Sequence, residues 1–200
     1  MASSPQNQGR EWCSLLRSTA ARKLAKLKPE QYRSSPSLPW YNEGLHFSCQ
    51  RCGRCCSGPP GIVQCTRAEA QAIAQALKIS WDDFLRYVGF AYKGGYFLRE
   101  VKTSFGFDCI LLQRPSDPKN AEAPSGCRVH MARPLQCRTW PFWPEVVYSP
   151  TAWRLAGKRC PGIGQGELHP WEEIRTKLAQ TPDPWAFPPE ELSLGQPLPF

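Results

Sequence analysis

Apolar residues recur every three or four positions near both ends of the chain, and this spacing predicts helices there. From Trp12 to Lys28 they form one face of an amphipathic helix whose opposite face is basic. Residues 169–180 show the same spacing, with Pro170 near the first helical position. We read the N-terminal segment as a docked or frayed terminal helix, with a partner-binding or organelle-targeting arm as the alternative.

Residues typical of helix N-termini predict two helices in the middle of the chain. Thr66 and Glu69 form a capping-box pattern ahead of apolar positions, which predicts a short helix over residues 66–79. Ser80 repeats the N-cap signal for a second helix over residues 81–88.

Beyond residue 95 the pattern changes from helical to extended. Residues 96–101 and 105–112 are rich in aromatic and branched side chains, and the sequence KTSFG between them predicts a hairpin that carries Cys109. Residues 114–126 are expected to form a polar surface loop, and residues 159–167 a tight turn. The segment that follows the polar loop is interrupted by prolines, and we expect it to pack over the cysteines.

Composition narrows the fold class. The chain has 200 residues with 21 prolines and 15 glycines, and proline lacks a backbone donor and fixes φ, so turns are many and long elements few. We expect a small, loop-rich, metal-stabilised α+β protein with short helices and a hairpin packed around a cysteine cluster. Three segments are expected: a basic helix and linker over 1–39, a cysteine-cluster metal-binding domain over 40–166, and a short helix with a proline-rich tail over 167–200.

The cellular compartment decides whether the ten cysteines are expected to form disulfides or to bind metal. The N-terminal segment interrupts each short apolar run with Arg, Lys or Ser, so it does not match a secretory signal, and no window approaches the roughly 18 apolar residues of a membrane span. We therefore expect a cytoplasmic protein without a membrane span. In a reducing compartment closely spaced cysteines more often bind metal than form disulfides.

Four cysteines are concentrated in the sequence FSCQRCGRCCSG, namely Cys49, Cys52, Cys55 and Cys56. The C-x-x-C-x-x-C spacing wraps a turn so that three sulfurs converge while backbone N–H groups stay free to point at them. Adjacent side chains tend to diverge, so Cys56 is read as facing a second metal or packing as a small buried residue. With the later cysteines, eight thiols can surround one polynuclear centre or two four-ligand sites. Cys13 and Cys65 are read as unliganded.

Four stretches together resemble the YkgJ-type cysteine-cluster family, also called the CxxCxxCC or zinc- or iron-chelating domain. They are FSCQRCGRCCSG, DCILL, GCRVHMARPLQCRTWPF and CPGIGQG, in this order over about residues 45–166. His130 departs from the pattern, because an aromatic residue is usual there, so we read His130 as structural or exposed and not as a ligand. The resemblance implies metal ligands at Cys49, Cys52, Cys55, Cys56, Cys109, Cys127, Cys137 and Cys160.

Arginines near these cysteines are expected to offset the negative charge that several thiolates leave on a metal. The resemblance includes the pairs Arg133-Pro134 and Cys137-Arg138. We expect Arg133 and Arg138 to form charge-assisted hydrogen bonds around the centre.

The metal is left open between an iron–sulfur cluster and zinc, with the cluster favoured. Structural zinc sites usually pair two C-x-x-C turns, whereas this chain combines one dense turn with four dispersed cysteines. Three clustered cysteines with a remote Cys160-Pro161 are similar to bacterial ferredoxins. The flagellin lysine-N-methylases share this cysteine region and are regarded as iron–sulfur proteins, so the resemblance points the same way.

Three functions are compared. The leading one is a metal-binding protein with a structural or redox centre and an unknown protein or small-molecule partner; its zinc form is an alternative. A second is a methyltransferase-related enzyme, by analogy with the flagellin methylases, but no glycine-rich strand-to-helix turn suits a nucleotide-like cofactor. Nucleic-acid binding is suggested by the net charge of +8, yet residues 1–39 supply +5 of it through seven Lys or Arg against two Glu.

If the eight thiols are ligands, distant parts of the chain have to meet. Pro134, Pro141 and Pro161 force turns beside three of the cysteines, and turns leave backbone donors free to bond sulfur. We expect one region to contain the sulfurs of Cys49, Cys52, Cys55, Cys127, Cys137 and Cys160, with Cys109 and Cys56 at its border.

Overall fold

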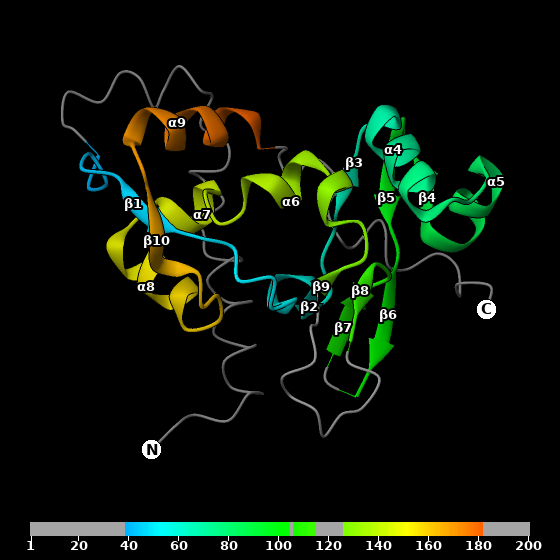
Figure 1. The fold of residues 1–200 in the computed structure, drawn as a ribbon, viewed down its shortest axis with the longest axis horizontal. Coiled ribbons are helices and arrows are strands. Elements are labelled where there is room, and N and C mark those ends of the chain that lie inside the picture. The colour runs from blue at the N-terminus through cyan, green and yellow to red at the C-terminus, as the bar shows by residue number, and fades with distance from the viewer. Residues whose placement is uncertain (1–38, 105, 115–125, 182–200) are drawn as a thin grey trace.

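The computed structural model describes residues 39–104, 106–114 and 126–181. This part of the chain combines short helices with small antiparallel sheets, which is the expected α+β class. It forms two lobes, a first lobe around α4 (Arg67–Leu77) and a second lobe around α9 (Trp171–Gln180), as Figure 1 shows. The predictions for the helix at 12–28, for Cys13, for most of the polar loop and for the proline-rich tail lie outside the described residues.

The first lobe begins at the predicted capping box, which is present. The Thr66 hydroxyl accepts the Glu69 N–H at 3.2 Å, and the Glu69 carboxylate accepts the Thr66 N–H at 2.9 Å. The second predicted helix starts at the expected Ser80 cap, but it widens after one turn, so that α5 (Trp81–Asp83) continues into the π-helical turn η2 (Phe84–Val88).

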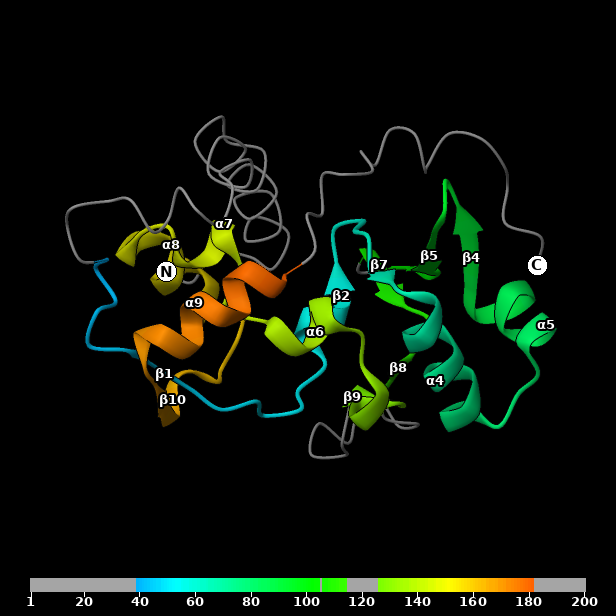
Figure 2. The same cartoon turned by 90° about the horizontal axis from the view of Figure 1, so that it is seen from above.

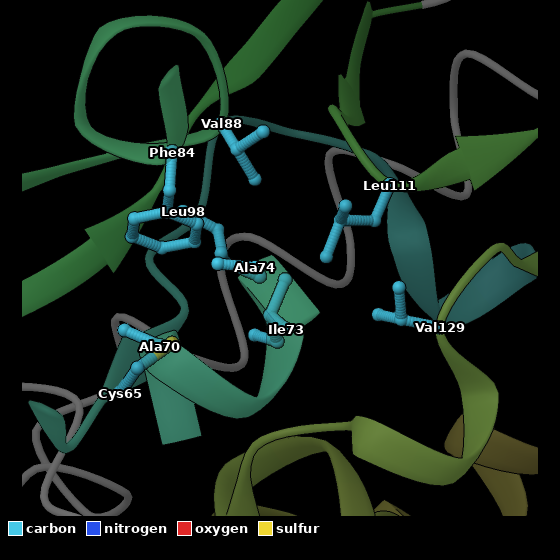
Figure 3. Close-up of a cluster of buried hydrophobic side chains, with 9 residues drawn as sticks. All are labelled: Cys65, Ala70, Ile73, Ala74, Phe84, Val88, Leu98, Leu111 and Val129. Atoms are coloured by element: carbon cyan, nitrogen blue, oxygen red, sulfur yellow. The ribbon is translucent and has the colours of Figure 1, made fainter. Parts of the chain in front are cut away.

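A three-stranded antiparallel sheet covers this helix pair, in the order β3 (Gln64–Cys65), β5 (Gly95–Leu98), β4 (Gly89–Tyr92). Together they enclose the first cluster, a group of buried side chains that are all labelled in Figure 3: Cys65, Ala70, Ile73, Ala74, Phe84, Val88, Leu98, Leu111 and Val129. Leu111 and Val129 face the helix from the segments that carry Cys109 and Cys127, and both cysteines pack against the cluster. The first core is therefore continuous with the cysteine region.

The predicted hairpin is present in a shifted form. β6 (Glu100–Thr103) pairs with β7 (Gly106–Cys109), but the residues before it, 95–98, belong to the other sheet. The chain changes sheets at Arg99, because its N–H donates to Val88 while the next strand turns toward β7. β2 (Ser57–Gly58) extends the hairpin on its other side, and β8 (Leu112–Gln113) pairs with β9 (Gly126–Cys127).

The second lobe combines β1 (Leu45–Phe47) and β10 (Ile163–His169) with α7 (Pro144–Val147), α8 (Pro150–Gly157) and α9. These elements bury the second cluster: Leu45, Phe142, Val146, Val147, Trp153, Ala156, Ile174 and Leu178. A ring of partly buried side chains, mostly aromatic, surrounds it, and the Trp40 indole N–H donates to the Val147 carbonyl at 2.7 Å. The second core is thus held by large apolar surfaces and by contacts distant in sequence.

Residues 159–167 contain the expected turn in part, because the Ile163 N–H donates to the Cys160 carbonyl and the Gln165 N–H donates to the Gly162 carbonyl. From Ile163 the chain is extended and pairs with β1. Gly164 and Gly166 lie in the left-handed region, with φ of 77° and 72°, and the register of the pairing shifts between His46 and Phe47. A Cβ at Gly162 would collide with the Ser48 carbonyl, so the two segments touch backbone to backbone. The expected segment boundary at 166 falls inside β10.

Between the lobes lie the 3₁₀ turn η1 (Arg54–Cys56), β2, β9, the 3₁₀ turn η3 (His130–Ala132) and α6 (Leu135–Thr139). Figures 1 and 2 both place α6, β2 and β9 between the two groups of elements. None of the helices in the described part of the chain has the length and hydrophobicity of a membrane span. All of the predicted metal ligands lie in or next to this middle region.

Candidate metal centre

The loop from Cys49 to Cys56 is folded by two residues in the left-handed region. Arg51 has φ 51° and Gly53 has φ 69°, and the Cys56 N–H then donates to the Gly53 carbonyl at 2.9 Å. Only glycine adopts such a φ without strain, whereas Arg51 adopts it at a cost of about 1–3 kcal/mol. The loop therefore keeps a conformation that tertiary contacts have to hold.

The side chains of Cys55 and Cys56 were expected to diverge, but they point toward each other. Their sulfurs lie 3.7 Å apart, at the end of this loop. The Cys56 thiol donates to the Cys55 sulfur, which lowers the pKa of Cys55 and raises that of Cys56. Two Zn–S bonds of 2.3 Å at a tetrahedral angle separate their sulfurs by about 3.8 Å. The adjacent pair thus has the spacing of two ligands on one tetrahedral ion.

Three of the later cysteines share one local arrangement. The backbone N–H two residues further on bonds each sulfur: that of Leu111 to Cys109, that of Val129 to Cys127, and that of Gly162 to Cys160. These bonds favour the thiolate, but burial outweighs them and raises all three pKa values, that of Cys109 to about 11. Amide hydrogen bonds to sulfur are typical of metal-bound thiolates.

Cys137 reaches the region on α6 (Leu135–Thr139), which hydrogen bonds hold to the first lobe. Glu69 of the α4 capping box accepts the Leu135 N–H at 2.7 Å, and it does so through the oxygen that does not cap α4. The side chain of Gln136 accepts the Gln64 N–H and donates to the Ile62 carbonyl, each at 2.8 Å. Burial raises the pKa of Cys137 well above its ordinary value. The helix that carries this thiol is therefore hydrogen-bonded both to α4 and to the segment that contains β3.

Cys55 lies at the centre of the thiol group. Its negative charge contributes to raising the pKa values of Cys109, Cys127, Cys137 and Cys160. The charges of Cys109 and Cys137 likewise raise the pKa of Cys56. Cys109 and Cys56 are therefore each near other thiols, and their expected place at the border of the group stays a prediction.

No three Cys, His, Asp or Glu side chains of the described residues stand close enough together to hold a metal ion as they are. The structure instead brings potential ligands together in pairs. One pair is Cys55 with Cys56, and another is Cys49 with His130, whose Nε2 lies 3.9 Å from the Cys49 sulfur.

His130 lies beside the cysteine loop. Its ring, read as structural or exposed, faces the exposed Cys49, while its Nδ1 is buried without a hydrogen-bond partner. Burial and the charges of Arg133 and Arg51 lower the pKa of His130, which favours the neutral imidazole. The available signal was its spacing of three residues from Cys127.

Positive charge reaches the sulfurs from one predicted arginine and one that was not predicted. Arg133 donates to the His130 carbonyl at 3.0 Å, and its charge lowers the pKa values of Cys55 and Cys127. Arg159 donates two hydrogen bonds to the Arg54 carbonyl, and its guanidinium interacts with the charges of Cys52, Cys55 and Cys56. Arg138 instead lies 3.4 Å from Glu69.

Two further residues near the centre have defined surroundings. The Trp140 indole N–H donates to the Cys160 sulfur at 3.5 Å. Cys65, read as unliganded, is buried in the first cluster, where burial raises its pKa to about 12.

The cysteine-bearing part of the chain is similar in sequence to known proteins. Residues 48–161 match the family model CxxCxxCC, described as "Putative zinc- or iron-chelating domain". The chain is also 34% identical over 109 residues to the uncharacterized protein MJ0661 of Methanocaldococcus jannaschii, a match that covers 53% of this chain and 50% of that protein. The chain thus spans half the length of this curated relative. No solved structure matches. Since the family model covers more than half of its residues, the chain belongs to the CxxCxxCC family of zinc- or iron-chelating domains.

Proposed function

We propose that the chain chelates tetrahedral metal ions through its cysteine thiolates, and that the neighbouring Cys55 and Cys56 bind the same ion. The observation that carries this proposal is their sulfur separation of 3.7 Å, which agrees with the value of about 3.8 Å for two thiolates on one zinc ion. Cys109 and Cys137, which lie within the residues that the family model matches, are our candidates to complete this site, and the charges of both act on Cys56.

The surroundings of these residues fit a bound cation. Burial raises the pKa values of Cys109 and Cys137, so without metal their thiols are protonated at neutral pH. A divalent ion would take the place of the protons and link segments distant in sequence. The N–H group of Leu111, together with the guanidinium groups of Arg133 and Arg159, would then offset the charge of the thiolates.

The two pairs of neighbouring side chains, Cys55 with Cys56 and Cys49 with His130, help to decide which metal is bound. Four cysteines hold the four irons of a [4Fe–4S] cluster, one on each iron, whereas zinc or either iron of a [2Fe–2S] cluster takes two or more protein ligands. The imidazole beside Cys49 favours zinc, because zinc sites commonly mix nitrogen and sulfur ligands. Zinc is therefore our first candidate for the metal.

A two-iron cluster is the second candidate. It is supported by the C-x-x-C-x-x-C loop with the remote Cys160-Pro161 and by the N–H groups bonded to three of the sulfurs.

The test is purification of the full chain under anaerobic conditions, followed by assays of zinc, iron and sulfide and a visible spectrum. We expect colourless protein with bound zinc; brown protein with equal iron and sulfide selects the second candidate. Cys56→Ala should lose one ion per chain, whereas Cys13→Ala should keep the full metal content. Wild-type protein that holds no metal, or a Cys56 variant that binds as the wild type does, would contradict the proposal.

A further inference from the structure

The chain contains three histidines, and their surroundings set one apart. His46 is exposed, and its ring is bonded to a backbone carbonyl. His169 has a partner at each ring nitrogen. His130 has one nitrogen buried without a partner and the other facing the sulfur of Cys49.

The distance between Cys49 and His130 fits two ligands of one ion. With Zn–S and Zn–N bonds of about 2.3 and 2.05 Å, a tetrahedral angle separates sulfur from nitrogen by about 3.6 Å. The observed separation is 3.9 Å. A small rotation of either side chain closes the difference, since neither is confined to the core.

The spacing along the chain supplies two further ligands. Cys49 and Cys52 form one C-x-x-C turn, and Cys127 with His130 forms a C-x-x-H turn in which the Val129 N–H bonds the Cys127 sulfur. Structural zinc sites commonly join two such turns.

The two turns are in contact. A Cβ at Gly126 would lie 3.1 Å from the Arg51 carbonyl oxygen, so the backbone just before Cys127 meets the backbone between Cys49 and Cys52. β9 also contacts η1, the turn in which the cysteine loop ends.

We propose that Cys49, Cys52, Cys127 and His130 form a separate tetrahedral metal site with three thiolates and one imidazole. The proposal rests on the proposed function, because it assumes that the chain chelates metal. It adds a second ion, distinct from that of Cys55 and Cys56, and a nitrogen ligand.

The experiment is a titration of the reduced, metal-free full chain with Co²⁺, followed by its visible absorption. The wild type should bind two ions. His130→Ala should bind one of them more weakly by at least the roughly 100-fold that loss of an outer hydrogen-bond partner can cause, and keep the other. His130→Cys should restore tight binding, with the absorption bands at longer wavelength because a fourth thiolate replaces nitrogen.

Controls separate this site from the general proposal. His46→Ala changes an exposed histidine and should match the wild type, and far-UV circular dichroism verifies that each variant is folded. A folded His130→Ala protein that binds two Co²⁺ ions with wild-type affinity and bands would overturn the site. A single wild-type ion that is lost in Cys56→Ala but kept in His130→Ala would also overturn it and leave the proposed function standing. If the wild type binds no Co²⁺, both proposals fail.

Discussion

The two lobes bury their cores in different ways. The first cluster consists mainly of small and aliphatic side chains, with Phe84 as the one aromatic ring among its buried described residues, and Cys109 and Cys127 pack against it. In the second cluster Phe142 stacks on Trp153 at a ring separation of 5.8 Å, and further aromatic rings surround the pair. The core of the first lobe is therefore completed by residues of the cysteine region, whereas the core of the second lobe is built from large apolar side chains of its own.

The largest effect should come from removing the metal. Thiolate ligation contributes on the order of 10 kcal/mol in small zinc domains, and here it would act on the lobe that shares its core with the thiols. We expect a chelator to abolish the hydrogen-exchange protection of α4 and β5 while α9 stays protected. Equal loss of protection in both lobes would mean that they fold as one unit and would remove the distinction between them.

The reverse experiment perturbs the aromatic core. Phe142 is completely buried, so Phe142→Ala should lower the free energy of unfolding of the second lobe by about 3–5 kcal/mol, as measured by denaturant titration. The metal content should change little, because the thiol pairs lie outside this cluster. Tyr87→Ala, at an exposed aromatic residue of the first lobe, is the control and should have a small effect.

A smaller effect is expected at Glu69, which joins the first lobe to α6. Glu69→Ala removes the acceptor of the Leu135 N–H and the capping-box acceptor of the Thr66 N–H, and we expect a loss of about 1–3 kcal/mol in unfolding free energy. Because α6 carries Cys137, metal affinity should fall roughly 10-fold to 100-fold. Gln71→Ala, at an exposed position of the same helix, should leave the affinity unchanged. Equal affinities in the two variants would show that α6 is positioned without Glu69.

The smallest effect concerns pH and the second lobe alone. A hydrogen bond from Lys177 lowers the pKa of Glu173 below its ordinary 4.5. The resulting stabilisation is present above pH 4.5 and is lost as the pH falls through the lowered value. Glu173→Gln should therefore be less stable than the wild type by under about 1 kcal/mol at neutral pH, and the difference should vanish in acid. Thermal melts across this range measure it, with the exposed Glu172→Gln as the control. A difference that persists at low pH would exclude the ion pair as its cause.

Local signals in the sequence were read correctly where neighbours in the chain decide the structure. The capping box at Thr66 and the Ser80 cap involve residues three positions apart, and both are present. The turn expected over residues 159–167 is present in part, but the pairing of β10 with β1 was not predicted, because it depends on residues more than a hundred positions away. α8 begins at Ser149, which caps it by accepting the Ala152 N–H, and this signal was overlooked.

The cysteine positions were predictable, but their grouping was not. Spacing indicated that Cys49, Cys52 and Cys55 form one loop, yet the approach of Cys56 to Cys55 depends on the backbone turn at Gly53. The place of His130 beside Cys49 is set by the contact of β9 with that loop. Such contacts join segments that are far apart in the sequence, and the order of the segments along the chain does not indicate which of them are close in space.

The pairing of β1 with β10 has a consequence for chain entropy. β1 leads directly into the loop of Cys49, and β10 follows shortly after Cys160, so the two strands close the whole cysteine-bearing stretch into a ring. Closing a loop of this length costs on the order of 4 kcal/mol in the random-coil limit. With β1 and β10 paired, the chain segments of Cys49 and Cys160 lie side by side, so an incoming ion does not have to gather them from an open chain.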